Sequence, residues 1–101
     1  MQEEKHKLLR ICAGLSEIHF KKLNAYSNSN LTGTNLYGAN LHNTGLGNVV
    51  LKNANLASAN LTDADLGGAD LTGANLTNAD LIGATLAGAN LHCTGNSVCI
   101  H

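Results

Sequence analysis

The chain has 101 residues, enough for one domain, and carries a formal net charge of −1 with 13 % charged residues. This balance indicates neither a polyanionic nor a polycationic partner, so nucleic acid is not expected as a ligand. No apolar run approaches the ~20 residues of a membrane span, and no hydrophobic secretory core follows the start, so we expect no membrane association and a cytoplasmic location. A periplasmic or lumenal location stays open in case a signal peptide has been removed.

Residues 1–14 are predicted to form an N-terminal capping helix. Glu3 and Glu4 occupy the first turn, where the helix dipole favours negative charge, and Gly14 suits the residue just past the end. The helix would cover the open first coil of the structure that follows; a partner-docking helix and a disordered arm are the alternatives. Its apolar residues are Leu8, Leu9, Ile11 and Cys12.

The segment 15–28 is an imperfect version of the five-residue repeat that follows it. Phe20 holds a central position, and Leu23 points inward three residues later. Counting by fives from Phe20 arrives one residue short of Leu31, so we expect a degenerate first repeat with a phase slip. A bulge or loop near residues 26–28 would absorb the extra residue.

Residues 29–93 contain thirteen consecutive five-residue units, each with a central leucine. The residue two before the leucine is Ala in nine units, and the residue directly before it is Asn or Asp in ten. The second residue after the leucine is a turn former in twelve units, Cys93 being the exception. The predicted core consists of Leu31, Leu36, Leu41, Leu46, Leu51, Leu56, Leu61, Leu66, Leu71, Leu76, Leu81, Leu86 and Leu91.

A period of five excludes the two common regular structures. On an α-helix every fifth residue steps ~140° around the axis, which would spread the leucines over the whole surface. On a flat strand an odd period sends successive leucines to opposite faces. A corner in every unit keeps Leu and Ala inside, so the chain is predicted to wind into a solenoid. Stacked Asn side chains can form ladders between its coils, whereas Asp cannot donate to one.

The tandem A-(N/D)-L-x-x units resemble the pentapeptide-repeat family, and the chain looks like one of its small cyanobacterial-type members. The resemblance implies an all-β solenoid, namely a right-handed quadrilateral (four-sided) parallel β-helix of about three coils with an N-terminal α-helical cap. Residues 8–14 also resemble the capping helix of some small members. Four units per coil would stack Leu31, Leu51, Leu71 and Leu91 in one interior column.

The tail, residues 94–101, ends the pattern because Asn96 stands where the next leucine is due. Two Cys and two His within ten residues leave three alternatives: a zinc site, a disulfide between Cys93 and Cys99, and a plain tail of small residues. The disulfide would need an oxidising compartment, whereas an odd number of cysteines without framework spacing fits a reducing one.

The last coil has little apolar cover, which Val98, Cys99 and Ile100 supply. An uncovered coil exposes strand edges, and a second copy presenting the same surface would close both ends at once. A C-terminal homodimer is therefore one expectation. A monomer whose tail folds over the coil is the other, and we prefer the monomer.

No catalytic, cofactor-binding or metal-binding residues are predicted, because no nucleophile, base and oxyanion donors converge on a pocket. We expect a non-catalytic scaffold that presents flat solenoid faces to a protein partner of unknown identity. The resemblance implies one alternative, a DNA-mimicking inhibitor or protector of DNA gyrase. Four aspartates on a short rod fall far below the charge density of duplex DNA, one charge per ~1.7 Å, which argues against it.

Overall fold

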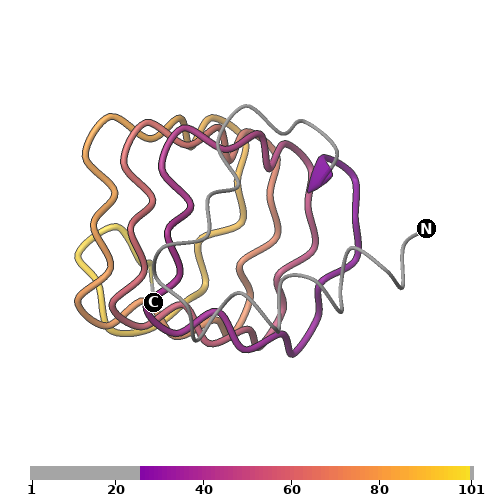
Figure 1. Ribbon diagram of the computed structural model, residues 1–101. Helices are drawn as coiled ribbons and strands as arrows, with labels where there is room; N and C mark the ends of the chain where they lie inside the picture. The colour runs from indigo at the N-terminus through magenta and orange to yellow at the C-terminus, as the bar shows by residue number, and fades with distance from the viewer. Residues whose placement is uncertain (1–25, 101) are drawn as a thin grey trace.

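The computed structural model describes residues 26–100, which wind into a four-sided solenoid (Figure 1). Within these residues the regular structure consists of turns and single-residue parallel β-bridges, without an α-helix or a longer strand. No membrane-spanning helix occurs in this part of the chain. The bridges are Asn30 to Val50, Asn35 to Asn55, Asn40 to Asn60, Gly45 to Asp65, Val50 to Asp70, Asn55 to Asn75, Asn60 to Asp80, Asp65 to Thr85, Asp70 to Asn90, and Asn75 to Thr94.

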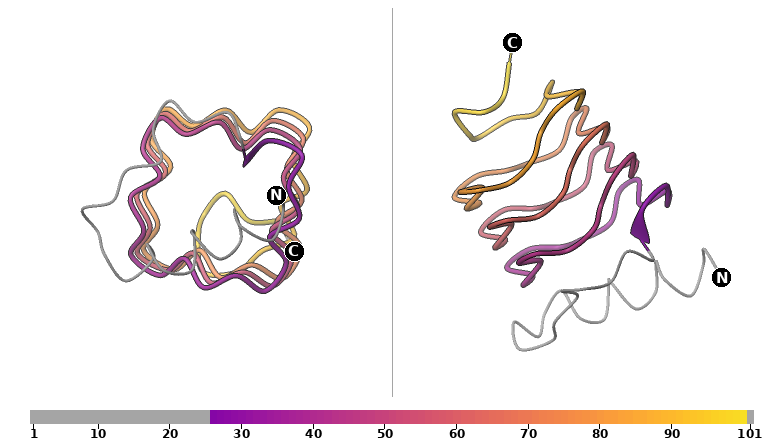
Figure 2. Two further views of the ribbon diagram at one scale, coloured as in Figure 1. Left: turned by 45° about the vertical axis from the view of Figure 1, so that its right-hand side comes forward. Right: turned by 90° about the horizontal axis from the view of Figure 1, so that it is seen from above.

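Nine of the ten bridges join residues twenty apart, which is four units per coil. Each bridge is flanked by backbone hydrogen bonds: the Leu31 amide donates to the Val50 carbonyl at 2.7 Å, and the Val50 amide donates to the Ser29 carbonyl at 2.9 Å. The same pair of bonds recurs from coil to coil, so successive coils hold each other as neighbouring strands of a parallel sheet do. Seen along the axis, the coils superpose as a square outline (Figure 2).

A tight turn forms the corner of every unit from that of Tyr26 to that of Leu86. The leucine carbonyl accepts a hydrogen bond from the amide three residues later, as from Thr34 to Leu31 at 3.1 Å, and the second residue after the leucine has a positive φ, 72° at Gly33. This is the pattern of a type II turn, which favours Gly or Asn at that position. The non-glycine residues that adopt it are Asn28, Asn43, Asn48, Asn53, Ser58, Asp63 and Asn78.

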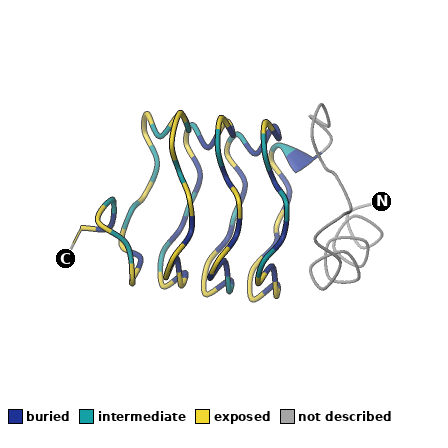
Figure 3. Cartoon of the chain, turned by 60° about the vertical axis from the view of Figure 1, so that its left-hand side comes forward, coloured by how far each residue is buried: buried dark blue, intermediate teal, exposed yellow. Residues whose placement is uncertain are grey.

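The interior is filled by leucine columns with smaller residues between them. Buried and exposed residues alternate along the coils (Figure 3). Ten leucines have at most 1 % of their surface exposed: Leu31, Leu36, Leu41, Leu46, Leu51, Leu56, Leu61, Leu66, Leu71 and Leu76. The last three, Leu81, Leu86 and Leu91, are only partly buried because no complete coil follows them. The core is thus closed along its length and less well covered at the C-terminal end.

The Asn and Asp residues before the leucines brace the corners and do not build the expected ladders. In all ten such units the side-chain Oδ1 accepts a hydrogen bond from the backbone amide two residues later, as from Thr62 to Asn60 at 3.0 Å. Where that later residue is Thr, its hydroxyl donates to the same oxygen, at 2.7 Å for Thr62. Only an acceptor oxygen is needed, which explains why Asn and Asp alternate freely there.

The first described residues correct the expectation of a bulge at 26–28. Tyr26 is 2 % exposed, and its carbonyl accepts from the Ser29 amide at 3.1 Å, as a leucine carbonyl does in later units. Asn28 has a φ of 67° and donates its amide to the Gly47 carbonyl at 2.9 Å. Tyr26 therefore occupies a leucine position, five residues before Leu31 and in phase with the repeats. The predicted capping helix with Leu8, Leu9, Ile11 and Cys12 lies outside the described residues, as does the degenerate repeat before Tyr26.

Candidate functional site: the sides and the C-terminal end

The outer surface of the solenoid has four sides, each made of units stacked twenty residues apart. We number them by their leucines: side 1 contains Leu31, Leu51, Leu71 and Leu91; side 2 contains Leu36, Leu56 and Leu76; side 3 contains Leu41, Leu61 and Leu81; side 4 contains Leu46, Leu66 and Leu86. Each side includes the corner that follows its leucines. The residue directly after the leucine lies at that corner, and its identity varies most from unit to unit.

Side 1 carries the one ion pair among the described residues, between Lys52 and Asp70 of adjacent coils, with 4.0 Å between Nζ and Oδ2. The Thr72 hydroxyl and the Thr72 amide donate hydrogen bonds to Asp70, and these bonds, with a smaller contribution from Lys52, hold the pKa of the Asp70 carboxyl below its ordinary value. Both charged side chains are well solvated, so the ion pair adds little stability.

Side 3 carries an inter-coil contact and the most exposed large apolar residue of the range 26–100. His42 Nδ1 lies 3.0 Å from the Thr62 carbonyl and 2.7 Å from the Thr62 hydroxyl of the next coil. Ile82, in the coil after that, is 76 % exposed. On side 2, Tyr37 is 57 % exposed. Isolated apolar residues of this kind are common on protein surfaces.

Side 4 is the smoothest because its corner residues have almost no side chain. Gly47 and Gly67 occupy the corner in two successive coils, and Ala87 occupies it in the next coil. A Cβ built on Gly47 would meet nothing closer than 3.7 Å. The larger residues of this side are Asn48, Asp65 and Thr85.

The acidic residues of the described region do not gather on one surface. Asp63 and Asp80 belong to side 3, Asp65 to side 4 and Asp70 to side 1. Within residues 26–100 no group of three or more His, Cys, Asp or Glu side chains is arranged to hold a metal ion. The zinc alternative for the tail loses its ligands, because Cys93 and Cys99 form a disulfide with each other.

The C-terminal end departs from the repeat by losing one residue. Thr94 bridges Asn75, nineteen residues earlier, where every other bridge spans twenty. Cys93 therefore does not take the turn position that the five-residue count assigns to it. It stacks inside over Ala74 and is 2 % exposed. After the shift, the Gly95 backbone lies against Thr77, the residue after Leu76 in the coil below.

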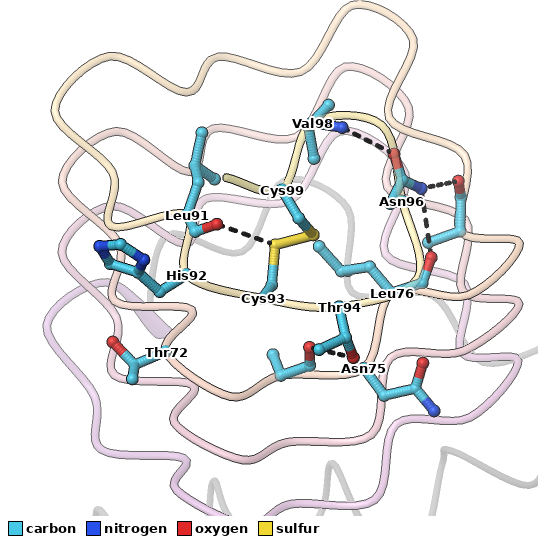
Figure 4. The surroundings of a disulfide bond; sticks show 12 residues. Thr72, Asn75, Leu76, Leu91, His92, Cys93, Thr94, Asn96, Val98 and Cys99 are labelled. Atoms are coloured by element: carbon cyan, nitrogen blue, oxygen red, sulfur yellow. Dashed lines mark hydrogen bonds between the residues drawn. A yellow bond between two sulfur atoms is a disulfide. The ribbon is translucent and has the colours of Figure 1, made fainter. Parts of the chain in front are cut away.

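After Gly95 the chain crosses the end of the solenoid and returns to side 1 (Figure 2). The side-chain amide of Asn96 donates to the Leu76 and Ala79 carbonyls, both at 3.1 Å, and the Ile100 amide donates to the Leu91 carbonyl at 2.8 Å. Figure 4 shows the disulfide between Cys93 and Cys99 at the centre of this crossing. We call residues 95–100 the C-terminal lid.

The three residues proposed for a C-terminal interface have different environments. Val98 is partly buried and packs against the core, Cys99 is 8 % exposed within the disulfide, and Ile100 is 53 % exposed. Only Ile100 offers a large apolar surface to a partner. The sequence did contain a signal for the altered path at this end: Cys93 is the single unit end without a turn former.

The comparisons with known proteins agree with this architecture. The family described as Pentapeptide repeats (8 copies) matches residues 26–53, 34–73 and 54–92. Searched against curated proteins, the sequence finds no match.

Solved structures of pentapeptide repeat proteins are also similar. One from the cyanobacterium Nostoc has a TM-score of 0.54 and 28 % identity, with 91 % of this chain and 76 % of that one covered. One from the thylakoid lumen of Arabidopsis thaliana has a TM-score of 0.57 and 23 % identity, with 88 % and 73 % covered. HetL of Nostoc, involved in heterocyst differentiation regulation, has a TM-score of 0.48 and 26 % identity; 82 % of this chain and 47 % of HetL are covered, so the chain spans about half of HetL.

Proposed function

Because the chain belongs to the pentapeptide repeat family, we propose that it is a non-catalytic scaffold that presents the sides of a right-handed quadrilateral β-helix to a protein partner. The observation that supports this most directly is that the residues of each unit have different structural roles. Leucine and the small residues fill the interior, and Asn or Asp braces the corner. The residue after the leucine donates its backbone amide to this brace, but its side chain takes part in the brace only where it is Thr, as at Thr62. Its outward side chains therefore remain available for recognition.

The range of residues at this outward position fits such a role. It includes the aromatic Tyr37, the aliphatic Ile82, the cationic Lys52 and the glycines of side 4. Because backbone ladders fix the spacing of these side chains, a partner would meet a preformed surface and would order little of it on binding. Preformed surfaces favour recognition without large changes in shape.

The experiment is chemical cross-linking and capture from a lysate of the source organism with one variant per side. Lys52→Glu, Tyr37→Glu, Ile82→Glu and Ala87→Glu alter sides 1 to 4, and all four positions are exposed in the structure. We expect one captured protein to be lost with one variant and kept with the other three, while all four variants melt within a few degrees of the unaltered chain. Equal recovery with all four variants would contradict binding through a side.

The DNA-mimicking alternative has no support from the arrangement of charge. Four aspartates fall on three sides, and Lys52 partly neutralises one of them. A duplex mimic needs negative charge in continuous rows. Added to a DNA gyrase supercoiling assay, the protein is expected to leave the rate unchanged; inhibition at micromolar concentration would favour the mimic.

A further inference from the structure

The C-terminal lid depends on few contacts other than its disulfide. Asn96 anchors its first half through the two hydrogen bonds to Leu76 and Ala79. Past Asn96, the lid attaches to the coils through one backbone bond, from Ile100 to Leu91, and through the packing of Val98 and Cys99 against the core. The disulfide joins this second half to Cys93, which the inter-coil bond from Thr94 to Ala74 holds in place at 2.9 Å.

The last coil, beneath the lid, lacks packing and backbone hydrogen bonds that the earlier coils have within residues 26–100. Its leucines, Leu81, Leu86 and Leu91, are only partly buried even with the lid in place. On sides 3 and 4 the amides of Leu81 and Leu86 find no acceptor within residues 26–100, although the equivalent amides of earlier coils donate to the following coil. Loss of the lid would expose more of these leucines beside a free backbone edge, which is a surface prone to association.

From this geometry we propose that the C-terminal lid is a redox-controlled cover: the disulfide keeps it closed, and reduction by a dithiol reductant opens it. The reductant's thiolate attacks the sulfur of Cys99, the more exposed of the two residues, and Cys93 leaves as a thiolate. The second thiol of the reductant then resolves the mixed disulfide. The lid gains two electrons and two protons as Cys93 and Cys99 become thiols, and the reductant becomes a disulfide.

Loop-closure entropy gives the size of the effect. The disulfide closes a loop with a sequence separation of 6. When the entropy of the chain is considered alone, opening a loop of this length shifts the equilibrium between the closed and the open lid toward the open lid on the order of fiftyfold. The loss of this loop closure does not affect the four leucine columns of the interior, because each interior coil is held by backbone hydrogen bonds to the coils on both sides. Reduction should therefore loosen the lid and leave the middle coils intact.

The test is residue-resolved amide exchange by NMR, before and after addition of dithiothreitol. A Cys12→Ala background leaves Cys93 and Cys99 as the sole cysteines. After reduction we expect exchange at Cys99 and Ile100 to accelerate on the order of fiftyfold. The amides of Leu56 and Leu61, which donate to the next coil at 2.8 Å, should be unchanged.

The matched control is Cys93→Ala with Cys99→Ala in the same background. Alanine at position 93 reproduces the residue that stacks there in the coil below, Ala74, so the variant should fold and behave like the reduced protein with or without dithiothreitol. Unchanged exchange at Ile100 after reduction would overturn the proposal. Faster exchange throughout the middle coils would also overturn it, because the disulfide would then hold the whole fold. So would a response to dithiothreitol in the double-alanine variant.

Discussion

Truncating Leu66 tests the column packing that defines this fold. Leu66 is 0 % exposed and lies between Leu46 and Leu86 in its column on side 4. Its amide donates to the Thr85 carbonyl at 2.8 Å and the Asp65 carbonyl accepts from Leu46 at 2.8 Å, so the backbone on both sides is fixed and the walls of a cavity have little freedom to collapse. Leu66→Ala should therefore lower the free energy of unfolding by roughly 3 to 4 kcal/mol, which lies within the usual range for buried leucines.

The control for this substitution lies in the same column. Leu86→Ala removes the same atoms from a leucine that is already partly exposed, so it should cost roughly 1 to 2 kcal/mol. Urea unfolding followed by circular dichroism measures both losses, and the melting temperature of Leu66→Ala should fall by roughly 10 to 20 °C. A loss below about 1 kcal/mol for Leu66→Ala, or equal losses for the two variants, would refute the closed column.

Four further outcomes are expected. Asn60→Asp should leave stability nearly unchanged, whereas Asn60→Ala should cost about 1 kcal/mol by urea unfolding because the corner loses its acceptor oxygen; equal effects would show that this bond does not matter. The Asp70 carboxylate should stabilise the fold fully above its unfolded pKa, near 3.8, and this stabilisation should be lost as pH falls through the lower folded pKa. In thermal melts from pH 7 to 2, Asp70→Asn should therefore lose less stability than the unaltered chain over that pH range. The same pH dependence in both proteins would show that the Asp70 carboxylate does not stabilise the fold. Deletion of residues 1–14 should promote aggregation in light scattering, and a stable monomer would make that segment a candidate partner-binding element. The intact chain should scatter as a 10.5 kDa monomer; if the mass doubles, Ile100→Asp should restore the monomer, and a dimer that survives this change would place the contact on a side.

The periodic part of this structure was predictable because one physical constraint repeats. A leucine every fifth residue has to point inward in every unit, and the turn formers in phase with it place the corners. The bridges twenty residues apart confirm the four-sided coil that the resemblance implied. The leucine spacing alone is sufficient to predict the coil, because a backbone that turned with any other period would bring leucines to the surface.

The roles of single side chains were harder to predict. Asn60 and Asp65 hold equivalent positions, and sequence alone does not tell an inter-coil ladder from a bond within the same turn. The phase of Tyr26 was missed because an aromatic residue replaces the leucine there. Both errors arise because the repeat fixes where a residue lies but not which neighbour its polar atoms or its ring will find.

Cys93 shows most clearly how one residue changes the chemistry of the end. Counted by fives, it belongs to a turn and would face outward, away from any partner in the tail. One residue fewer between Leu91 and Thr94 turns it inward, where it meets Cys99. A disulfide prediction therefore needed the backbone path first, and the missing turn former at Cys93 and the missing leucine at Asn96 were the local signs that this path would change.

The two kinds of surface on this solenoid should respond differently to an occupant. On the sides, the backbone amides of the interior coils already donate hydrogen bonds to the neighbouring coils. A partner bound to a side would therefore add contacts without changing how fast these amides exchange. At the C-terminal end the amides of Leu81 and Leu86 have no acceptor within residues 26–100, and the leucines there are incompletely covered. An occupant of that end would complete the missing coil contacts and slow amide exchange selectively in the last coil. The place where protection rises on binding therefore separates a partner of the sides from one that replaces the lid.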